Sequence, residues 1–232
     1  MRIHILTIFP EMFDGIFGFG MVRRAVDREL ASIHRIDLRE YTSDAHRTVD
    51  DRPFGGGAGM VLKPEPICLA IDDLQARLGV RPHILLLSAQ GKLARQRDIE
   101  RWSRLTDLLL ICGRYEGVDE RIARHVADEE VSVGDYVLSG GEFPAMLLTE
   151  AMIRLLPGVV GKEESVLTDS FTCGRLGYPS YTRPPEYRGW KVPEILLSGD
   201  HERIRRWRQE QSAEKTARNR PDIMEASDAN PG

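Results

Sequence analysis

Short apolar runs alternate with helical patterns through the first two thirds of the chain, and this alternation constrains the fold more than any other feature. Residues 3–9, 33–38, 84–87 and 108–112 have the apolar composition of buried strands. Helical patterns separate them: one begins at about residue 11, is interrupted over 15–20 and resumes over 21–31, and others cover 64–78, 96–105 and 142–156. This order predicts an α/β fold with a mainly parallel sheet, in which ligands bind beyond the carboxyl ends of the strands.

Two apolar strands run into glycine-containing polar loops between residues 110 and 142. The first loop reads CGRYEG and the second, after a short helix and a strand, reads SVGDYVLSGGE. Glycine lets the backbone approach a ligand closely, although any one of these glycines also fits an ordinary tight turn. Five glycines beside Glu116 and Asp135 favour a pocket that recognises its ligand largely through main-chain groups.

The long polar stretch over residues 41–59 is a second candidate recognition loop. It carries Arg47, Asp50, Arg52 and four glycines, with almost no aliphatic residue. Arginine binds phosphate and aspartate accepts hydrogen bonds from a guanine edge, so this composition suits RNA. A flexible connector is the alternative interpretation.

Composition and charge change after residue 161. We expect an N-terminal domain over 1–161, a linker over 162–176, a small helical C-terminal domain over 177–224 and a disordered tail over 225–232. Residues 201–220 carry seven Lys or Arg against three Glu, although the formal charge of the whole chain is -4. This local excess predicts a surface for nucleic-acid phosphates, whereas a packed helix face around Trp207 with flanking arginines is the alternative.

Several common classes of protein are disfavoured. No Gly-x-Gly-x-x-Gly follows a strand, and Gly91-Lys92 lacks the glycine that a P-loop requires. The six His and three Cys are scattered without ligand spacing, so no metal site is expected from them. We find neither a signal-peptide pattern nor an apolar run of roughly 18 to 20 residues, and therefore expect a cytoplasmic protein without a membrane segment.

Six motifs, taken together, carry a family resemblance. They are 50–60 (DDRPFGGGAGM), 112–121 (CGRYEGVDER), 134–142 (GDYVLSGGE), 169–171 (DSF), 181–184 (YTRP) and 196–199 (LLSG). The chain closely resembles, from residue 1 to about 220, the bacterial tRNA (guanine-N1)-methyltransferases of the TrmD type in the SPOUT superfamily. The resemblance implies a SPOUT-type parallel sheet with a deep trefoil knot, a known exception to the rule against threaded chains. It also implies a homodimer with active sites at the subunit interface and S-adenosylmethionine as methyl donor.

The resemblance assigns roles to individual residues. The cofactor contacts fall on Leu87, Ser88, Gly113, Tyr115, Glu116, Ser132, Val133, Gly134, Tyr136, Leu138, Gly140 and Gly141. Substrate contacts fall on Asp50, Arg52, Gly59, Arg183, Arg208 and Arg220. The general base falls on Asp169, with Arg154 as its partner on the guanine. Each residue also has an alternative interpretation: an isolated Asp in a loop is typical of a helix N-cap, and an Arg at the end of a helix complements the helix dipole. Leu86, Ala89 and Phe143 depart from residues common in the family.

The implied reaction is methylation of N1 of the guanine immediately 3′ of the tRNA anticodon, at position 37. Guanine N1 carries a proton at neutral pH, so the reaction needs a base such as the Asp169 carboxylate, while Arg154 stabilises charge on O6. Glu116 would favour the sulfonium cofactor or recruit a divalent ion such as Mg²⁺. Two other functions stay open: an RNA-binding module regulated by an adenosine-type ligand, and a transferase acting on the ribose 2′-OH.

Overall fold

The computed structural model describes residues 1–161, 169–171 and 174–223. The chain divides into two compact units, Met1–Gly161 and Lys162–Gly232. The expected tail over 225–232 and most of the expected linker over 162–176 lie outside the described residues.

The first unit is built on a five-stranded parallel sheet with the order β2-β1-β6-β5-β7. Its strands are β1 (Arg2–Thr7), β2 (Ser32–Asp37), β5 (His83–Leu93), β6 (Asp107–Cys112) and β7 (Glu129–Ser132). The central strand β6 is buried at every position, which explains why its sequence after Asp107 is a continuous apolar run, and the buried Asp107 carboxylate is paired with Arg2. The expected α/β fold with a parallel sheet is confirmed.

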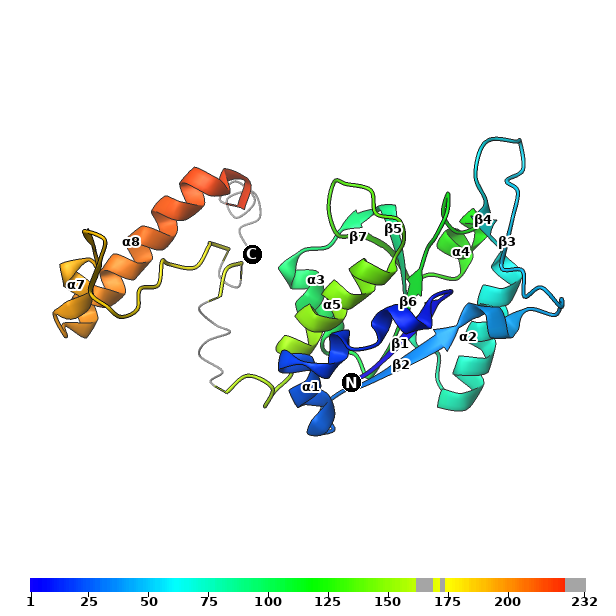
Figure 1. Cartoon of the computed structure of the whole chain (residues 1–232), viewed down its shortest axis with the longest axis horizontal. Coiled ribbons are helices and arrows are strands. Elements are labelled where there is room, and N and C mark those ends of the chain that lie inside the picture. Colours follow the sequence, from blue (N-terminus) through cyan, green and yellow to red (C-terminus); the bar gives the residue numbers. More distant parts are fainter. Residues whose placement is uncertain (162–168, 172–173, 224–232) are drawn as a thin grey trace. The chain divides into compact units, whose positions relative to one another are not determined.

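Helices cover both faces of this sheet (Figure 1). The helices α1 (Gly20–Asp27), α3 (Gln96–Trp102) and α5 (Glu142–Arg154) pack on one face, and α2 (Pro64–Leu78) and α4 (Glu120–His125) pack on the other. Side chains alternate between two cores with the period of two that a strand imposes: Ile3 and Ile5 join the first, Leu6 and Ile8 the second.

The prediction of a helix from about residue 11 is wrong for the first half of that segment. The chain instead forms two 3-10 turns, η1 (Pro10–Phe13) and η2 (Ile16–Gly18), before α1 begins. Gly15 separates the turns with φ of +83°, a conformation that an α-helix does not accommodate. The second half, expected to reach residue 31, ends at Asp27.

Strand β5 is longer than its apolar run over 84–87. It continues to Leu93 and pairs with β7 in two registers, Leu87↔Val131 and Lys92↔Val131. Gly91 permits this arrangement, because a Cβ at that position would lie 2.3 Å from the Val131 nitrogen. The sheet therefore gains an irregular edge beside the ends of β5 and β7.

The polar stretch over 41–59 is more ordered than a connector. It follows η3 (Leu38–Tyr41), and its second half forms a short hairpin in which β3 (Asp50–Asp51) pairs with β4 (Val61–Leu62).

Two helices end earlier than expected. The α3 helix ends at Trp102, three residues before the expected end, and α5 ends at Arg154.

The second unit is arranged around α8 (His201–Asn219), whose N-cap Asp200 accepts a hydrogen bond from the Arg203 amide at 3.1 Å. The short helix α7 (Glu194–Leu197) precedes it. The Leu176 amide donates to Thr216 Oγ1 and the Leu176 carbonyl accepts from Ser212 Oγ, so the incoming chain is fixed to α8. A hairpin of β8 (Glu186–Tyr187) and β9 (Trp190–Lys191) adds strand structure to the domain expected to be helical.

Candidate functional site

A pocket of about 290 Å³ lies where β5, β6 and β7 lead into their loops. It is formed by residues 86–90 of β5, by the loop after β6 and by the loop after β7. All twelve residues expected to contact the cofactor line it: Leu87, Ser88, Gly113, Tyr115, Glu116, Ser132, Val133, Gly134, Tyr136, Leu138, Gly140 and Gly141. Three segments that are far apart in the sequence therefore meet in one cavity at the edge of the sheet that binds ligands in α/β folds.

Main-chain contacts hold the two glycine loops of the pocket together. The Gly141 amide donates to the Gly113 carbonyl at 2.8 Å, and Arg114 and Gly140 form an isolated antiparallel bridge. A Cβ at Gly141 would lie 2.7 Å from the Cys112 Cα, so no larger residue fits without a backbone shift. Glycine is required at 141 by this close approach of two backbones.

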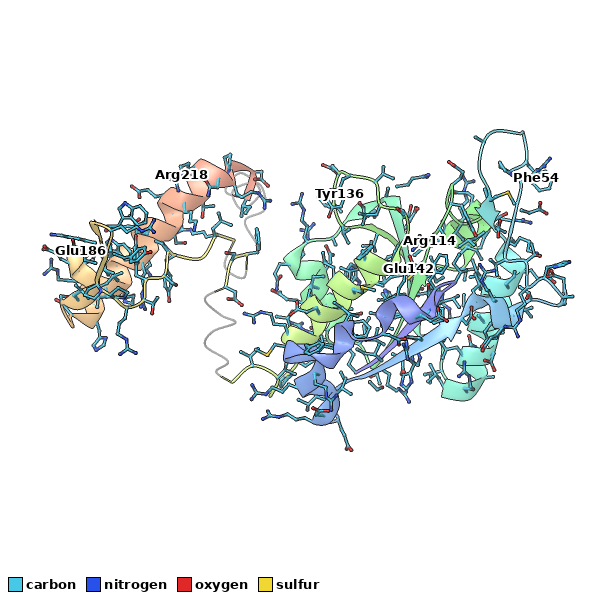
Figure 2. The ribbon with its side chains drawn as sticks, viewed as in Figure 1. Phe54, Arg114, Tyr136, Glu142, Glu186 and Arg218 are labelled. Carbon is cyan, nitrogen blue, oxygen red and sulfur yellow. The ribbon has the colours of Figure 1, made fainter. Side chains whose placement is uncertain are left out.

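The loop after β7 is folded back on itself by its own polar groups. Ser132 Oγ donates to the Gly134 carbonyl at 3.0 Å, and the Tyr136 amide donates to the same carbonyl at 2.9 Å. Tyr136 and Tyr115 both line the pocket and both keep about half of their surface exposed (Figure 2 labels Tyr136). The pocket therefore combines ordered main chain with accessible aromatic surface.

A buried carboxylate that sequence reasoning did not assign lies beneath this pocket. Glu142, the first residue of α5, is fully buried and accepts hydrogen bonds from Thr7 Oγ1 at 2.7 Å and from Arg114 Nε at 2.9 Å. The Arg114 guanidinium also lies 4.7 Å from the centre of the Phe9 ring. Figure 2 labels Arg114 and Glu142. This network ties the end of β1, the loop after β6 and the start of α5 together, and the only signal in the sequence is an acidic residue at the head of an apolar helix.

Cys112 ends β6 next to this network but is unsuited to thiolate chemistry. Burial raises the pKa of the Cys112 thiol well above its ordinary value, and the nearby Glu142 carboxylate acts in the same direction. A protonated thiol is a poor nucleophile and metal ligand. The polar groups of the pocket, rather than its cysteine, are the candidates for chemistry.

Two kinds of feature are absent from the part of the chain that the structure describes. Among these residues, no three or more His, Cys, Asp and Glu side chains are grouped as a metal site would require. None of the helices that they form is both long enough and apolar enough to cross a membrane.

The glycine loop after β3 is joined to the pocket wall. The Glu116 amide donates to the Met60 carbonyl, and the Leu62 amide donates to the Gly117 carbonyl, both at 3.0 Å. A Cβ on Gly59 would lie 2.4 Å from Glu116 Oε1, so this expected substrate residue adjoins an expected cofactor residue. At the far end of the loop, Phe54 is fully exposed (Figure 2).

The remaining expected site residues are distributed over both units. Asp50 lies in β3 and is half-buried, Arg52 follows it and is exposed, and Arg154 is the last residue of α5. In the second unit, Asp169 lines a polar hollow of about 310 Å³ with Ser170, Gly177, Tyr178, Ser180 and Lys215.

Of the three expected substrate arginines of the second unit, two have specific contacts. Arg208 lies over the Tyr178 ring, with Cζ 4.7 Å from its centre. Arg220 pairs with Asp222 at 2.7 Å and lies 5.4 Å from the centre of the Phe171 ring. Arg183 is exposed. The side chains of Arg208 and Arg220 are thus positioned by aromatic rings rather than extending freely.

Comparison with known proteins identifies the family. The family model described as tRNA (Guanine-1)-methyltransferase TrmD matches residues 1–226. The chain belongs to the TrmD family. Proteins named tRNA (guanine-N(1)-)-methyltransferase are 51% identical in Dictyoglomus turgidum and 48% identical in Bacillus licheniformis; each alignment covers 97% of this chain, and 90% and 93% of the relative.

A solved structure agrees with the family assignment. The crystal structure of the tRNA (m1G37) methyltransferase from Aquifex aeolicus matches with a TM-score of 0.78 and 40% identity, over 98% of this chain and 96% of the other. The resemblance inferred from the six motifs is therefore confirmed at the level of the TrmD family.

Proposed function

We propose that this protein transfers the methyl group of S-adenosylmethionine to N1 of the guanine at position 37 of tRNA. The observation that carries the proposal is the pocket beyond β5, β6 and β7, in which all twelve expected cofactor residues meet in a member of the TrmD family. The relatives' names give the reaction class, and the Aquifex aeolicus enzyme is named for modification at position 37.

The size and lining of the pocket support S-adenosylmethionine as its ligand. Its volume is close to the lower limit of about 300 Å³ for small-molecule sites. Leu87, Val133 and Leu138 offer apolar surface to a purine, and the backbone amides and carbonyls around Gly140 can form hydrogen bonds with the edge of that purine. When bound, this cofactor supplies an electrophilic methyl group on a positively charged sulfur, which the Glu116 carboxylate would favour.

The acid–base chemistry is assigned to Asp169 and Arg154. Guanine N1 becomes nucleophilic only as it loses its proton, and the Asp169 carboxylate would accept that proton. Arg154 donates a hydrogen bond to O6, where negative charge develops. Arginine suits this role because it stays protonated throughout.

Glu116 has a second candidate partner in this scheme, a divalent cation such as Mg²⁺. A carboxylate oxygen is a normal ligand of that ion. Turnover that stays unchanged after exhaustive chelation would remove the cation from the mechanism and leave Glu116 with the sulfonium group alone.

The second unit is proposed to bind tRNA, with 1–161 as the cofactor domain, 162–176 as linker and 177–224 as the RNA-binding domain. Residues 177–223 contain ten Lys or Arg against seven Asp or Glu, whereas the whole chain has a formal charge of -4. Positive charge held on one part of an acidic protein favours phosphate contacts there. We place the reaction in the cytoplasm with tRNA.

A deep trefoil knot and a homodimer complete the proposal. The close approach of the Gly141 backbone to that of Cys112 supports the knot. The dimer is supported by exposed apolar side chains on α5 and at the N-cap of the adjacent α1. Phe143 and Leu147 of α5 are 58% and 51% exposed, and Phe19 at the N-cap is 77% exposed. Exposed apolar groups of this size favour burial against a partner, for which a second copy of the chain is our choice. Sedimentation analysis should give twice the mass of the chain.

The decisive experiment locates the methyl group. Unmodified tRNA is incubated with the protein and S-adenosylmethionine labelled in its methyl group, and the modified nucleoside is identified by digestion and mass spectrometry. We expect 1-methylguanosine at position 37. A labelled ribose 2′-oxygen would instead support the ribose transferase, and RNA binding without any label would support the regulated binding module.

A further inference from the structure

The β8–β9 hairpin of the second unit presents two largely exposed aromatic side chains. Tyr187 and Trp190 are cross-strand partners and are 55% and 69% exposed. The two residues between them, Arg188 and Gly189, have φ of +54° and +81°, the signature of a tight type I′ turn. The rings are therefore held on a compact support rather than on a loose loop. Glu186, at the start of the hairpin, is labelled in Figure 2.

The two rings and the turn arginine fix one another. The centres of the Tyr187 and Trp190 rings are 6.1 Å apart with their planes inclined by 58°, a normal tilted aromatic pair. The Arg188 Cζ lies 5.3 Å from the centre of the Tyr187 ring. Because Trp190 is already restrained by its neighbour, a ligand that contacts the indole loses little side-chain entropy on binding.

The charge of the surroundings indicates what kind of ligand this is. The hairpin belongs to the stretch 177–223, in which cations outnumber anions by ten to seven in an otherwise acidic chain. Arg188 and Lys191 lie within the hairpin itself. An aromatic surface with neighbouring cations is the combination that binds single-stranded nucleic acid, in which bases stack on the rings and phosphates meet the cations.

We propose that Trp190, held by Tyr187, is a stacking platform for an unpaired base of the bound tRNA. In a double helix the faces of the bases are covered by their neighbours, so only a base in a loop, a bulge or an end can stack on a side chain. The inference rests on the proposed function, since it takes tRNA as the partner of the second unit. It adds a contact that reads the shape of the RNA outside the reacting guanine.

Binding measurements with three variants of the full-length protein test this platform. Trp190→Ser removes the ring and should weaken tRNA binding about tenfold, within the range for loss of one stacked base. Trp190→Phe keeps a ring and should stay within about threefold of the unaltered protein. Leu197→Ser is the matched control, because Leu197 is an exposed apolar side chain of the same unit, at 62%, but has no ring. Its affinity should be unchanged.

Two further readouts separate stacking from a structural or electrostatic role. The salt dependence of binding should have the same slope in Trp190→Ser, because stacking releases no counterions. In the unaltered protein, acrylamide should quench Trp190 fluorescence freely, and added tRNA should protect it. Trp102 is buried and Trp207 is half-buried, so Trp190→Phe identifies the component that changes.

Three outcomes would overturn the platform: normal affinity of Trp190→Ser, a Trp190 signal that is shielded before tRNA is added, or no protection by tRNA. Shielding before addition would indicate that protein covers the hairpin. Failure of the proposed function is recognised separately, since the unaltered protein would then not methylate N1 of tRNA guanine. Methylation with normal binding by Trp190→Ser rejects the platform alone.

Discussion

The two units of this chain differ in how their functional groups are held. In the first unit, two apolar cores enclose the sheet, and the pocket residues are fixed by main-chain bonds and by the buried Glu142. In the described part of the second unit, Thr216 is the only residue in the buried class, and Tyr181, Tyr187, Trp190 and Leu197 are all more than half exposed. A small ligand needs a cavity that exists before binding, whereas a large RNA can supply the missing packing itself. Four predictions test this division.

The largest effect is expected for Asp169→Asn, which would show that the second unit contributes chemistry as well as RNA contacts. The amide cannot accept the N1 proton, and loss of a general base commonly costs about 10² to 10⁴ in rate. Single-turnover methyl transfer should fall by that amount while the affinity for S-adenosylmethionine, measured by calorimetry, stays the same. A normal rate would contradict the assignment of the base.

A substitution within the rigid pocket should act on the first unit alone. Gly141→Ala places a Cβ 2.7 Å from the Cys112 Cα, and overpacking of this kind costs about 1 to 3 kcal/mol. We expect S-adenosylmethionine affinity and thermal stability to fall together. Gly18→Ala is the control, because nothing lies within 4 Å of the added Cβ and the backbone is not in the left-handed region. Equal behaviour of the two variants would show that the pocket wall can move.

A smaller effect is expected from the cations of the second unit. Arg205→Ala removes one exposed charge from α8, and each lost phosphate contact lowers the slope of log affinity against log salt by about 0.7 to 0.9. Filter-binding titrations between low and moderate salt measure this slope. Arg97→Ala, an exposed arginine of α3, serves as the comparison in the first unit. If both variants change the slope equally, phosphate binding is not confined to the second unit.

The last prediction concerns acid sensitivity, which should arise in the first unit. Burial lowers the pKa of His4 to about 4, helped by the stacked His34 and opposed by Asp107, which also pairs with Arg2. Between pH 6.5 and 4 the unfolded chain therefore binds a proton that the folded chain does not, so the free energy of unfolding should decrease as pH falls through this window.

Replacement of His4 tests whether this residue causes the loss of stability at low pH. In His4→Gln, denaturant unfolding should depend less on pH between 6.5 and 4 than in the unaltered protein. His46→Gln, which changes an exposed ring, should keep the original dependence. An identical pH profile for His4→Gln would remove His4 as the source.

The features of the first unit that could be predicted are those determined by residues close together in the sequence. Strand β6 was identifiable because its buried positions 108–112 are all apolar, and Gly141 because its close contact with the Cys112 backbone leaves no room for a side chain. The continuation of β5 past Leu87 was not identifiable, since its residues from Ser88 to Lys92 are small or polar and are held by pairing with β7. Pairing of that kind depends on tertiary structure rather than on composition.

Long-range polar contacts were the second feature that could not be predicted from the sequence. Thr7, Arg114 and Glu142 meet in one buried network although Thr7 and Glu142 lie 135 residues apart in the sequence. No spacing rule connects them, because Thr7 ends β1, Arg114 lies in the loop after β6 and Glu142 begins α5. In the second unit, the β8–β9 hairpin was missed because each strand has only two residues, too few for an alternating pattern.

The hydrogen bonds that join Met60 and Leu62 to Glu116 and Gly117 have a thermodynamic consequence. They connect the base of the glycine loop directly to one wall of the cavity. On the proposed assignment of the loop to RNA and of the cavity to the methyl donor, a ligand that orders one part should also order the other, and the affinities for the two ligands should then change each other by the same factor.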